Sequence, residues 1–386
     1  MDKEYVFGTY ARDYTHFTRG RGARIYTNDN IEFIDFSSGI GVNSLGYANK
    51  GLVEVISTQA GKILHSSNLF LIEPQARLAK KIVELSGYKM KVFFSNSGLE
   101  ANECAIKLAR KYGENKNRFK IITLKNSFHG RSIATLKACA QDKMHKHFSP
   151  FPDGFIYAND IKEAMTLAKE DGKVVGIMLE LIQGEGGVRA FDKNEVLELS
   201  QFCKNNDILL MIDEVQSGIY RSGEFLASQV YNISPDIISL AKGLAGGIPI
   251  GATISSKDVF EIGDHGSTFG GNFLSTSASL YVLDALDSYK KSGDLALNIE
   301  LFENYLFELK NNFSNIILDV SGLGFMRGLR LINDEVLANI LNLAKKHRIL
   351  VLKSGNATLR FLPPINISKD EIIEGFSRLK GVLLEL

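Results

Sequence analysis

The chain has 386 residues, with 45 Lys and Arg against 44 Asp and Glu, so its formal net charge is +1. Hydrophobic residues make up 45% and charged residues 23%, which is typical of globular proteins and excludes the disordered class. The balanced charge gives no electrostatic reason to expect nucleic acid or an anionic membrane as a partner. Because the N-terminus lacks the apolar core of a secretory signal and no apolar run could span a bilayer, we expect a cytoplasmic protein.

The three cysteines also limit the possible classes of protein. Their odd number and wide spacing predict neither a disulfide framework nor a metal site. Cys104 and Cys203 lie in helix-like apolar patterns, where a free thiol behaves as a small core residue. A protein of a reducing compartment is the simplest interpretation.

The N-terminal segment, residues 1–49, contains one clear pattern. Residues 21–36 form two alternating runs around the turn-prone sequence Asn28-Asp29-Asn30. This spacing predicts a β-hairpin. We expect the segment to pack with a smaller domain that the C-terminal part builds.

Residues 50–275 are predicted to form a large α/β domain. Short apolar runs rich in β-branched residues alternate there with amphipathic patterns such as Glu100–Tyr112 and Asn194–Asn205. The runs are Val92–Phe94, Ile121–Leu124, Phe155–Tyr157, Val174–Leu179, Ile208–Ile212 and Ile237–Leu240. Continuous apolar strands between helices favour a mostly parallel sheet covered on both faces, an α/β/α arrangement.

Residues 276–386 are predicted to form a smaller α+β domain. Long helical patterns cover 275–290, 294–313, 333–347 and 369–384. Strand candidates at Ile316–Val320, Met326–Leu331 and Thr358–Phe361 interrupt them.

Candidate functional groups follow the predicted strands, since ligands of open α/β sheets bind past the carboxyl ends of the strands. Ser97-Gly98 follows the first strand and precedes a helix, so it offers either a phosphate site or an ordinary N-cap. Phe128, His129 and Arg131 share the loop after the next strand. They could stack on a flat ligand and bind a carboxylate, or form a surface loop.

Three further segments follow later strands. Glu180 and Glu185 belong to a segment with three glycines after a strand, which favours either backbone close to a ligand or a flexible turn. Asp213 follows a central strand, where a buried carboxylate needs a partner such as a protonated ring nitrogen, unless it caps the next turn. Lys242 follows Ile237–Leu240 among small apolar residues, and burial there would lower its pKa and make the amine nucleophilic, whereas most lysines are solvated.

Taken together, these segments have the parts that hold pyridoxal phosphate. They offer a phosphate cradle, an aromatic side chain to stack on the ring, an aspartate for the ring nitrogen and a buried amine for the aldehyde. Each signal is weak by itself, and the combination predicts this cofactor.

The same segments resemble the class III pyridoxal-phosphate aminotransferases, which have the type I fold of these enzymes. The resemblance runs from about residue 20 to residue 365 and rests on a set of short motifs. These are Ser97-Gly98 with Glu100-Ala101-Asn102-Glu103, Ser127-Phe128-His129-Gly130-Arg131, Gln183-Gly184-Glu185-Gly186-Gly187, Asp213-Glu214-Val215-Gln216, Ala241-Lys242-Gly243, Gly266 to Asn272 and Leu359-Arg360-Phe361.

For the cofactor ring, the resemblance implies a role for each matching residue. Lys242 would form the Schiff base and act as the acid and base of the proton shift. Asp213 would pair with the pyridinium nitrogen, and Gln216 would hydrogen-bond the ring oxygen. Val215 and Phe128 would pack on the two faces of the ring.

For the cofactor phosphate, the resemblance implies a site made by two subunits. Ser97, Gly98 and Leu99 would hold the phosphate, and Thr268 would arrive from the partner of a homodimer. Leu99 departs from the family pattern, where a smaller residue is commoner, but its backbone N–H is retained.

For substrates, the resemblance implies transfer of the terminal amino group of N2-acetylornithine to 2-oxoglutarate, a step of arginine biosynthesis. Arg360 would bind the α-carboxylate of glutamate, and Arg131 a distal or substrate carboxylate. Glu185 would pair with Arg360 when glutamate is absent. Ile40 stands where enzymes of free ornithine tend to carry Tyr, and an apolar residue suits an acylated amine.

Several alternatives remain open at this point. The amino donor could be succinyldiaminopimelate, in the lysine pathway or in both pathways, or it could be ornithine or 4-aminobutyrate. An aminomutase with the same fold would need no 2-oxoglutarate. A binding protein without activity is disfavoured because Lys242, Asp213 and Gln216 occur together.

Overall fold

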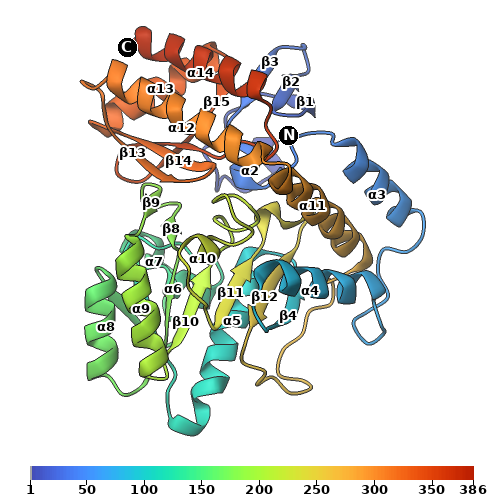
Figure 1. Ribbon diagram of the computed structural model, residues 1–386, viewed down its shortest axis with the longest axis vertical. Coiled ribbons are helices and arrows are strands. Elements are labelled where there is room, and N and C mark those ends of the chain that lie inside the picture. The colour runs from blue at the N-terminus through green and yellow to red at the C-terminus, as the bar shows by residue number, and fades with distance from the viewer. Residues whose placement is uncertain (1) are drawn as a thin grey trace.

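A seven-stranded sheet forms the centre of the larger part of the molecule (Figure 1) in the computed structural model, which describes residues 2–386. The strand order is β4-β12-β11-β10-β7-β5-β6. These strands are β4 (Lys91–Ser95), β5 (Lys120–Leu124), β6 (Phe155–Ala158), β7 (Val174–Leu179), β10 (Leu209–Asp213), β11 (Ile237–Leu240) and β12 (Gly251–Ser255). All the apolar runs expected to be strands lie in this sheet, so the predicted α/β architecture with a mostly parallel sheet is confirmed.

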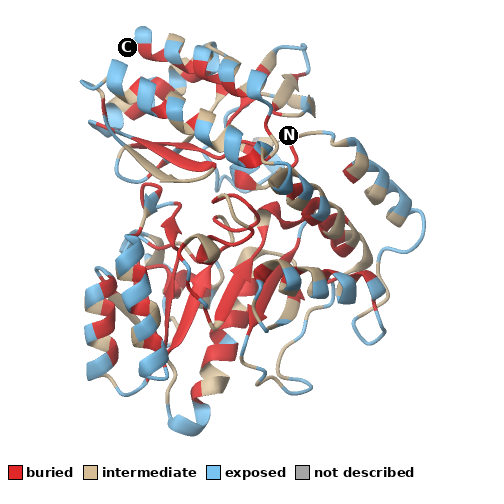
Figure 2. Cartoon of the chain, in the orientation of Figure 1, coloured by how far each residue is buried: buried red, intermediate tan, exposed pale blue. Residues whose placement is uncertain are grey.

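The apolar runs are strands because both faces of the sheet are covered. In β10, Leu210 and Ile212 belong to a core shared with α8 (Ile161–Glu170) and α9 (Lys193–Asn205). Leu209 belongs to a second core on the opposite face, shared with α5 (Gly98–Gly113). Successive side chains of a strand point to opposite faces, so a strand buried on both sides is continuously apolar. Figure 2 shows these central strands as buried throughout.

One strand of this sheet was not expected from the sequence. The strand β12 lies between β4 and β11 and runs antiparallel to both. Its sequence, Gly251-Ala252-Thr253-Ile254-Ser255, is small and partly polar, yet every residue is buried. The Thr253 hydroxyl satisfies its hydrogen-bonding capacity by donating to the carbonyl of Ala101, 2.7 Å away.

The N-terminal segment forms the expected hairpin and then joins the C-terminal part. Strand β2 (Arg24–Thr27) pairs antiparallel with β3 (Glu32–Asp35), and β1 (Phe17–Arg21) extends the sheet. On its other side β3 pairs in parallel with β15 (Ile349–Leu350). The helices that follow along the chain are α2 (Ser38–Gly41), α3 (Lys50–Ala60) and α4 (Glu73–Ser86).

The C-terminal part consists of helices packed on an antiparallel sheet, which agrees with the mixture of helices and strands expected there. Helix α11 (Phe273–Lys291) packs on α3 and α4 and leads into the upper part of Figure 1. The other helices there are α12 (Asp294–Asn312), α13 (Asp334–Lys346) and α14 (Lys369–Leu384). The sheet has the order β13-β14-β17-β16, formed by β13 (Ile317–Leu323), β14 (Met326–Leu331), β17 (Thr358–Phe361) and β16 (Leu352–Ser354).

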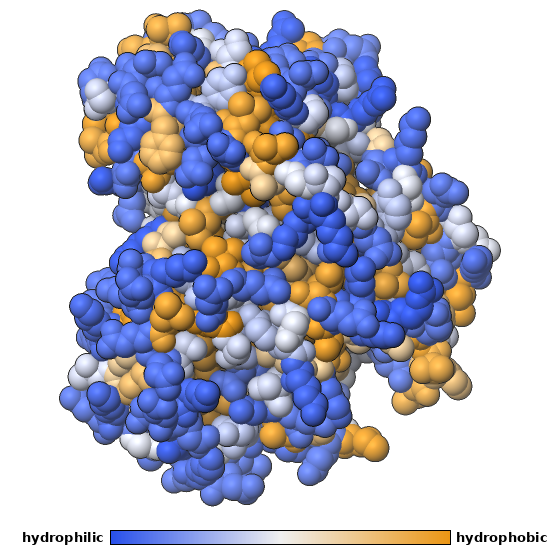
Figure 3. Space-filling view, viewed as in Figure 1, coloured by the Kyte–Doolittle hydropathy of each residue, from blue (hydrophilic) through white to orange (hydrophobic). Residues whose placement is uncertain are grey.

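Short elements complete the structure. They are α1 (Asp2–Tyr5), α6 (Ile133–Ala138), α7 (Asp142–His145), α10 (Ala227–Val230), β8 (Ile182–Gln183), β9 (Arg189–Ala190) and the 3₁₀ turns η1 (Glu114–Lys116) and η2 (Lys242–Ala245). No helix among residues 2–386 has the length and apolarity that crossing a membrane requires. The face seen in Figure 3 is mostly hydrophilic, with apolar patches across its middle.

A single large core extends through both parts of the molecule. It contains Ala23 and Phe36 near the N-terminus, Leu240 of the large sheet and Val382 near the C-terminus. The expected boundary between residues 275 and 276 falls inside α11. The division into segments 1–49, 50–275 and 276–386 therefore stays a prediction.

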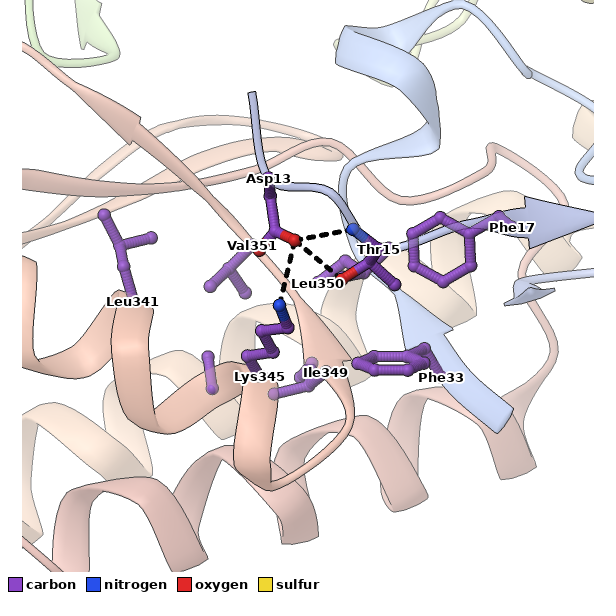
Figure 4. A pocket seen from close by; sticks show the side chains of 10 residues that line it. Asp13, Thr15, Phe17, Phe33, Leu341, Lys345, Ile349, Leu350 and Val351 are labelled. Atoms are coloured by element: carbon purple, nitrogen blue, oxygen red, sulfur yellow. Dashed lines mark hydrogen bonds and ion pairs between the residues drawn. The ribbon is translucent and has the colours of Figure 1, made fainter. Parts of the chain in front are cut away.

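A cavity of about 350 Å³ lies between the N-terminal segment and the C-terminal part (Figure 4). Its walls are apolar side chains such as Phe17 and Leu341, and Asp13 at its edge forms an ion pair of 2.9 Å with Lys345. The Thr15 backbone N–H and hydroxyl donate to the same Asp13 oxygen. No residue that lines this cavity is among the predicted functional residues, so it is distinct from the site described next.

Candidate active site

The predicted functional segments meet at one edge of the seven-stranded sheet. Strands β5, β7, β10 and β11 are parallel, and β4 has the same direction because β12 is antiparallel to both β4 and β11. The loops after these strands therefore leave the sheet on the same side, which is where open α/β sheets bind their ligands.

Asp213 is the last residue of β10 and is held by three donors. Its Oδ2 accepts hydrogen bonds from Asn102 Nδ2 at 2.7 Å and from His129 Nδ1 at 2.8 Å, and its Oδ1 accepts from the Val215 backbone N–H at 3.0 Å. The side chains of Asp213 and His129 are almost fully buried. Burial disfavours the charged imidazole, but the hydrogen bond and charge of Asp213 outweigh it and raise the pKa of His129. These contacts fix the orientation of the carboxylate.

Lys242 begins η2, two residues after β11. Its φ of 42° lies in the left-handed region, which is uncommon for a residue with a side chain. Desolvation of the amine, followed by the charge of Arg360, lowers the pKa of Lys242 to about 8. The direction agrees with the lowered lysine pKa expected from the sequence, and with this pKa roughly one amine in ten is uncharged at pH 7.

The turn between β4 and α5 has the form of an anion cradle. Ser97 is the N-cap of α5, and its Oγ accepts from the Glu100 backbone N–H at 3.3 Å. A Cβ on Gly98 would lie 2.6 Å from Cγ1 of Val215, so this position requires glycine for the close approach of the two segments. Leu99 packs against Gly130, with its Cβ 2.8 Å from where a Gly130 Cβ would be. Free N–H groups at a helix N-terminus favour a phosphate.

Arg360 and Glu185 form an ion pair beside this edge. Arg360 Nη1 donates to Glu185 Oε1 at 2.7 Å and to the Gly184 carbonyl at 3.1 Å. The Arg360 side chain is 4% exposed, whereas that of Glu185 is 41% exposed. The arginine is thus fixed, while its partner has room to leave toward solvent.

The other expected residues lie around the same edge. Phe128 is half-buried, and the Arg131 guanidinium carbon lies 5.7 Å from the centre of its ring. Ile40 is 44% exposed and has a φ of 66°. The chain just after Ile40 contacts the residue that follows Lys242, because Ser44 Oγ donates to the Gly243 carbonyl at 2.7 Å.

Thr268 lies in an exposed loop between β12 and α11. The neighbouring Ser267 accepts a hydrogen bond of 3.2 Å from the Asn96 side chain, next to Ser97. This contact places the loop beside the anion cradle of its own chain.

The comparison with known proteins establishes the family of the chain. The family model "Aminotransferase class-III" matches residues 9–383. The chain belongs to the class III aminotransferases. It is 52% identical to the acetylornithine aminotransferase of Wolinella succinogenes, over 99% of this chain and 98% of that protein. It is 43% identical to the acetylornithine aminotransferase of Aquifex aeolicus, over 98% of this chain and 100% of that protein.

Solved structures agree with this assignment. N-acetylornithine aminotransferase from Stenotrophomonas maltophilia superposes with a TM-score of 0.84 at 33% identity, over 97% of each chain. Ornithine aminotransferase from Toxoplasma gondii superposes with a TM-score of 0.93 at 27% identity, over 100% of this chain and 93% of that one. Class III aminotransferases depend on pyridoxal phosphate, and the predicted fold class and cofactor are confirmed.

The site residues of this class III aminotransferase fit that cofactor. Gln216 Oε1, in the side chain that would face the cofactor ring, is buried and has no hydrogen-bond partner among the described residues, and the same holds for Nε of Arg360, which would face a substrate. Buried polar atoms are normally paired, so such atoms in a site point to a polar ligand. The lowered pKa of Lys242 and the rigidly held Asp213 carboxylate are the two chemical features that the cofactor requires.

Three residues of the site were part of the quoted segments but were given no specific role in the sequence-based prediction. Asn102 and His129 orient Asp213, and Glu180 accepts hydrogen bonds from two loops. Asn102 lies on the apolar face of α5, where a buried amide needs partners, and this was the signal that could have revealed it. His129 and Glu180 were visible as polar residues after strands, but their partners depend on the tertiary fold.

Proposed function

We propose that this enzyme transfers the terminal amino group of N2-acetylornithine to 2-oxoglutarate and yields N-acetylglutamate 5-semialdehyde and glutamate. The observation that carries the proposal is the 52% identity to an acetylornithine aminotransferase along nearly the whole of both chains. The reaction is a step of arginine biosynthesis, and its substrates are small molecules.

When bound, pyridoxal phosphate supplies an aldehyde that takes up the amino group and a ring that withdraws electrons. In the proposal, Asp213 would keep the ring nitrogen protonated, and the Gln216 side-chain N–H would donate to the ring oxygen. Val215 and Phe128 would pack on the two ring faces. Lys242 would hold the aldehyde, and after the substrate amine displaces it, its Nζ would take the proton from the substrate carbon that bears the amine, a role that its lowered pKa of about 8 suits.

The phosphate contacts form a separate part of the proposal. Ser97, Gly98 and Leu99 would hold the phosphate at the N-terminus of α5. Thr268 would complete the site of the partner in a homodimer. Large apolar side chains in nearby loops support a second copy, since Leu69, Phe70 and Phe269 are 90%, 69% and 62% exposed in the single chain.

One site must accept two unlike substrates. Arg360 would bind the α-carboxylate of glutamate, and Arg131 a distal or substrate carboxylate. When N2-acetylornithine is bound, the pair of Arg360 with Glu185 would neutralise the unused arginine. Ile40 supports an acylated amine, because an apolar side chain offers no partner to a free ammonium group.

The assay measures glutamate formation by the holoenzyme from 2-oxoglutarate and each of four donors: N2-acetylornithine, succinyldiaminopimelate, ornithine and 4-aminobutyrate. The highest kcat/KM with N2-acetylornithine supports the proposal, and equal values with succinyldiaminopimelate would indicate a dual role. Ornithine is included as an alternative amino donor because the chain also superposes on an ornithine aminotransferase. Preference for ornithine, or turnover without 2-oxoglutarate, would contradict the proposal.

The homodimer has its own test. Inactive Lys242→Ala subunits are mixed with inactive Thr268→Asp subunits and allowed to exchange. Each mixed dimer then has one intact site, so activity should return to roughly one quarter of the wild-type value. No recovery in a verified mixed dimer would exclude the shared site. A cytoplasmic location is also part of the proposal and is supported by the three free, buried cysteines.

A further inference from the structure

Glu180 is a buried carboxylate that links two loops of the active site. It directly follows β7 and is 7% exposed. Its Oε1 accepts from the Phe128 backbone N–H at 2.8 Å, and its Oε2 accepts from the Gly184 backbone N–H at 3.1 Å. Each oxygen of the same carboxylate therefore holds a different loop.

The two loops carry different functions. One presents Phe128 to the cofactor ring in the proposed function. The other presents Gly184, whose carbonyl accepts from Arg360 Nη1 at 3.1 Å and from Ser354 Oγ at 2.7 Å. Glu185, the ion-pair partner of Arg360, is the next residue along the chain.

We propose that Glu180 is a positioning residue that, as a carboxylate, fixes the ring-stacking loop of Phe128 relative to the carboxylate-binding Arg360. The proposal rests on the proposed function for the roles of these two residues. Glu180 itself is not expected to touch the substrate.

The chemistry of the two bonds requires the charged form. A carboxylate offers acceptors on both oxygens, whereas a carboxylic acid or an amide turns one acceptor into a donor that faces an N–H group. Losing a hydrogen bond to a charged group typically changes an equilibrium constant roughly 10- to 150-fold. One loop would then be released while the other stays attached.

The two hydrogen bonds by which Glu180 links the loops, called the bridge below, depend on a carboxylate whose charge can respond to pH. Burial raises the pKa of Glu180 to about 7, against the lowering effect of His129. The charged and titratable groups that act on it or feel its charge are His129, Asp213, Cys139 and Lys242. We therefore expect the carboxylate to hold both loops at about pH 8 and above, and to lose one of the two bonds as the pH falls through 7 toward 6.

Glu214 provides a matched control. It is also fully buried, and its carboxylate also accepts from two backbone N–H groups, those of Ala227 and Ser228. Burial raises its pKa to about 7 as well. Its partners belong to α10 and not to the two loops, so Glu214→Gln repeats the chemical change without cutting the bridge.

The experiment compares Glu180→Gln and Glu214→Gln with wild type in three measurements. These are the dissociation constant of pyridoxal phosphate from the apoprotein, the visible circular dichroism of the bound cofactor, and kcat and KM for 2-oxoglutarate from pH 6 to 9. For Glu180→Gln we expect cofactor affinity and KM to weaken roughly tenfold or more, with reduced dichroism and a flattened pH dependence between pH 6 and 8. Glu214→Gln should resemble wild type in all three.

Equal changes in both variants, or a lower melting temperature for Glu180→Gln with wild-type dichroism and KM, would overturn the proposal. If Glu180→Gln does not fold, the dichroism of wild type is followed from pH 8.5 to 6, where the proposal requires the same decrease. Failure of the proposed function would appear separately, as lack of turnover of N2-acetylornithine by wild type. The cofactor affinity and dichroism would still test the bridge in that case.

Discussion

Replacing Arg360 by Lys should damage one half of the reaction and spare the other. In the structure the Arg360 guanidinium is nearly buried and donates both to Glu185 and to the Gly184 carbonyl, while its Nε is unpaired. The planar fork of arginine can bind a carboxylate through two parallel hydrogen bonds, and a lysine ammonium cannot reproduce that geometry.

The magnitude follows from the bonds that are lost. A hydrogen bond between charged groups contributes about 1.5–3 kcal/mol, and each 1.36 kcal/mol corresponds to a factor of ten. Losing one bond to the α-carboxylate should therefore lower kcat/KM for glutamate by roughly 10- to 150-fold. The transfer from N2-acetylornithine should change by less than about threefold, because Arg360 is then paired with Glu185.

Single-turnover kinetics separate the two halves. The loaded enzyme is mixed with glutamate or with N2-acetylornithine, and the decrease of the cofactor's visible absorbance is followed. Arg327→Lys is the matched control, since Arg327 is also nearly buried and paired, with Glu303 at 2.7 Å, and also donates to a backbone carbonyl, that of Gly322. Arg327→Lys should not slow the reaction with glutamate more than the reaction with N2-acetylornithine, or the reverse.

Equal losses with both donors would refute the reasoning, because Arg360 would then serve both substrates or only hold the fold. Unchanged kinetics with glutamate would refute it as well, since another group would have to bind the α-carboxylate.

Three other predictions concern single side chains. Burial raises the pKa of Glu214 from 4.5 to about 7, so the contribution of this group to the free energy of unfolding is complete below pH 4.5 and is lost as the pH rises through 7. When unfolding is measured against pH, the stability of Glu214→Gln relative to wild type should increase by about 3 kcal/mol from pH 4.5 to 8. A difference that stays constant with pH would contradict this. Ile40→Tyr should shift the ratio of kcat/KM from N2-acetylornithine toward ornithine by roughly tenfold, and an unchanged ratio would remove Ile40 from specificity. In the apoprotein, mass spectrometry after amine labelling should give Lys242 a midpoint near pH 8, whereas a midpoint near 10 would mean that the amine is solvated.

The sequence revealed the strands of the large sheet wherever both faces are apolar. The prediction for Ile237–Leu240 has the same bounds as β11. The prediction for Ile208–Ile212 begins and ends one residue before β10, so Asp213 belongs to the strand itself. The strand β12 was missed because Thr253 and the small residues around it owe their burial to neighbouring strands and to a side-chain hydrogen bond. Such burial depends on tertiary contacts and leaves no periodic pattern.

Residues at the site were predictable by type but not by partner. The lowered pKa of Lys242 could be anticipated from its apolar surroundings. The hydrogen bonds of Asp213 with Asn102 and His129 could not, because they join three segments that are distant in sequence. The same holds for Glu180, whose two backbone partners lie in different loops. The functional roles of the site residues stay predictions until the variants are measured.

The parallel pairing of β3 with β15 has a consequence for synthesis of the chain. Ile34 pairs with Ile349, which is made roughly 300 residues later. At about 5–20 residues per second, the ribosome adds that length in roughly 15–60 s. Throughout this interval Ile34 lacks its strand partner and Phe36 lacks the rings that it packs on, which also come late in the chain, whereas Phe33 can already contact Phe17. The first hairpin to emerge is thus among the last to be completed, and apolar side chains of this hairpin stay without their partners until then.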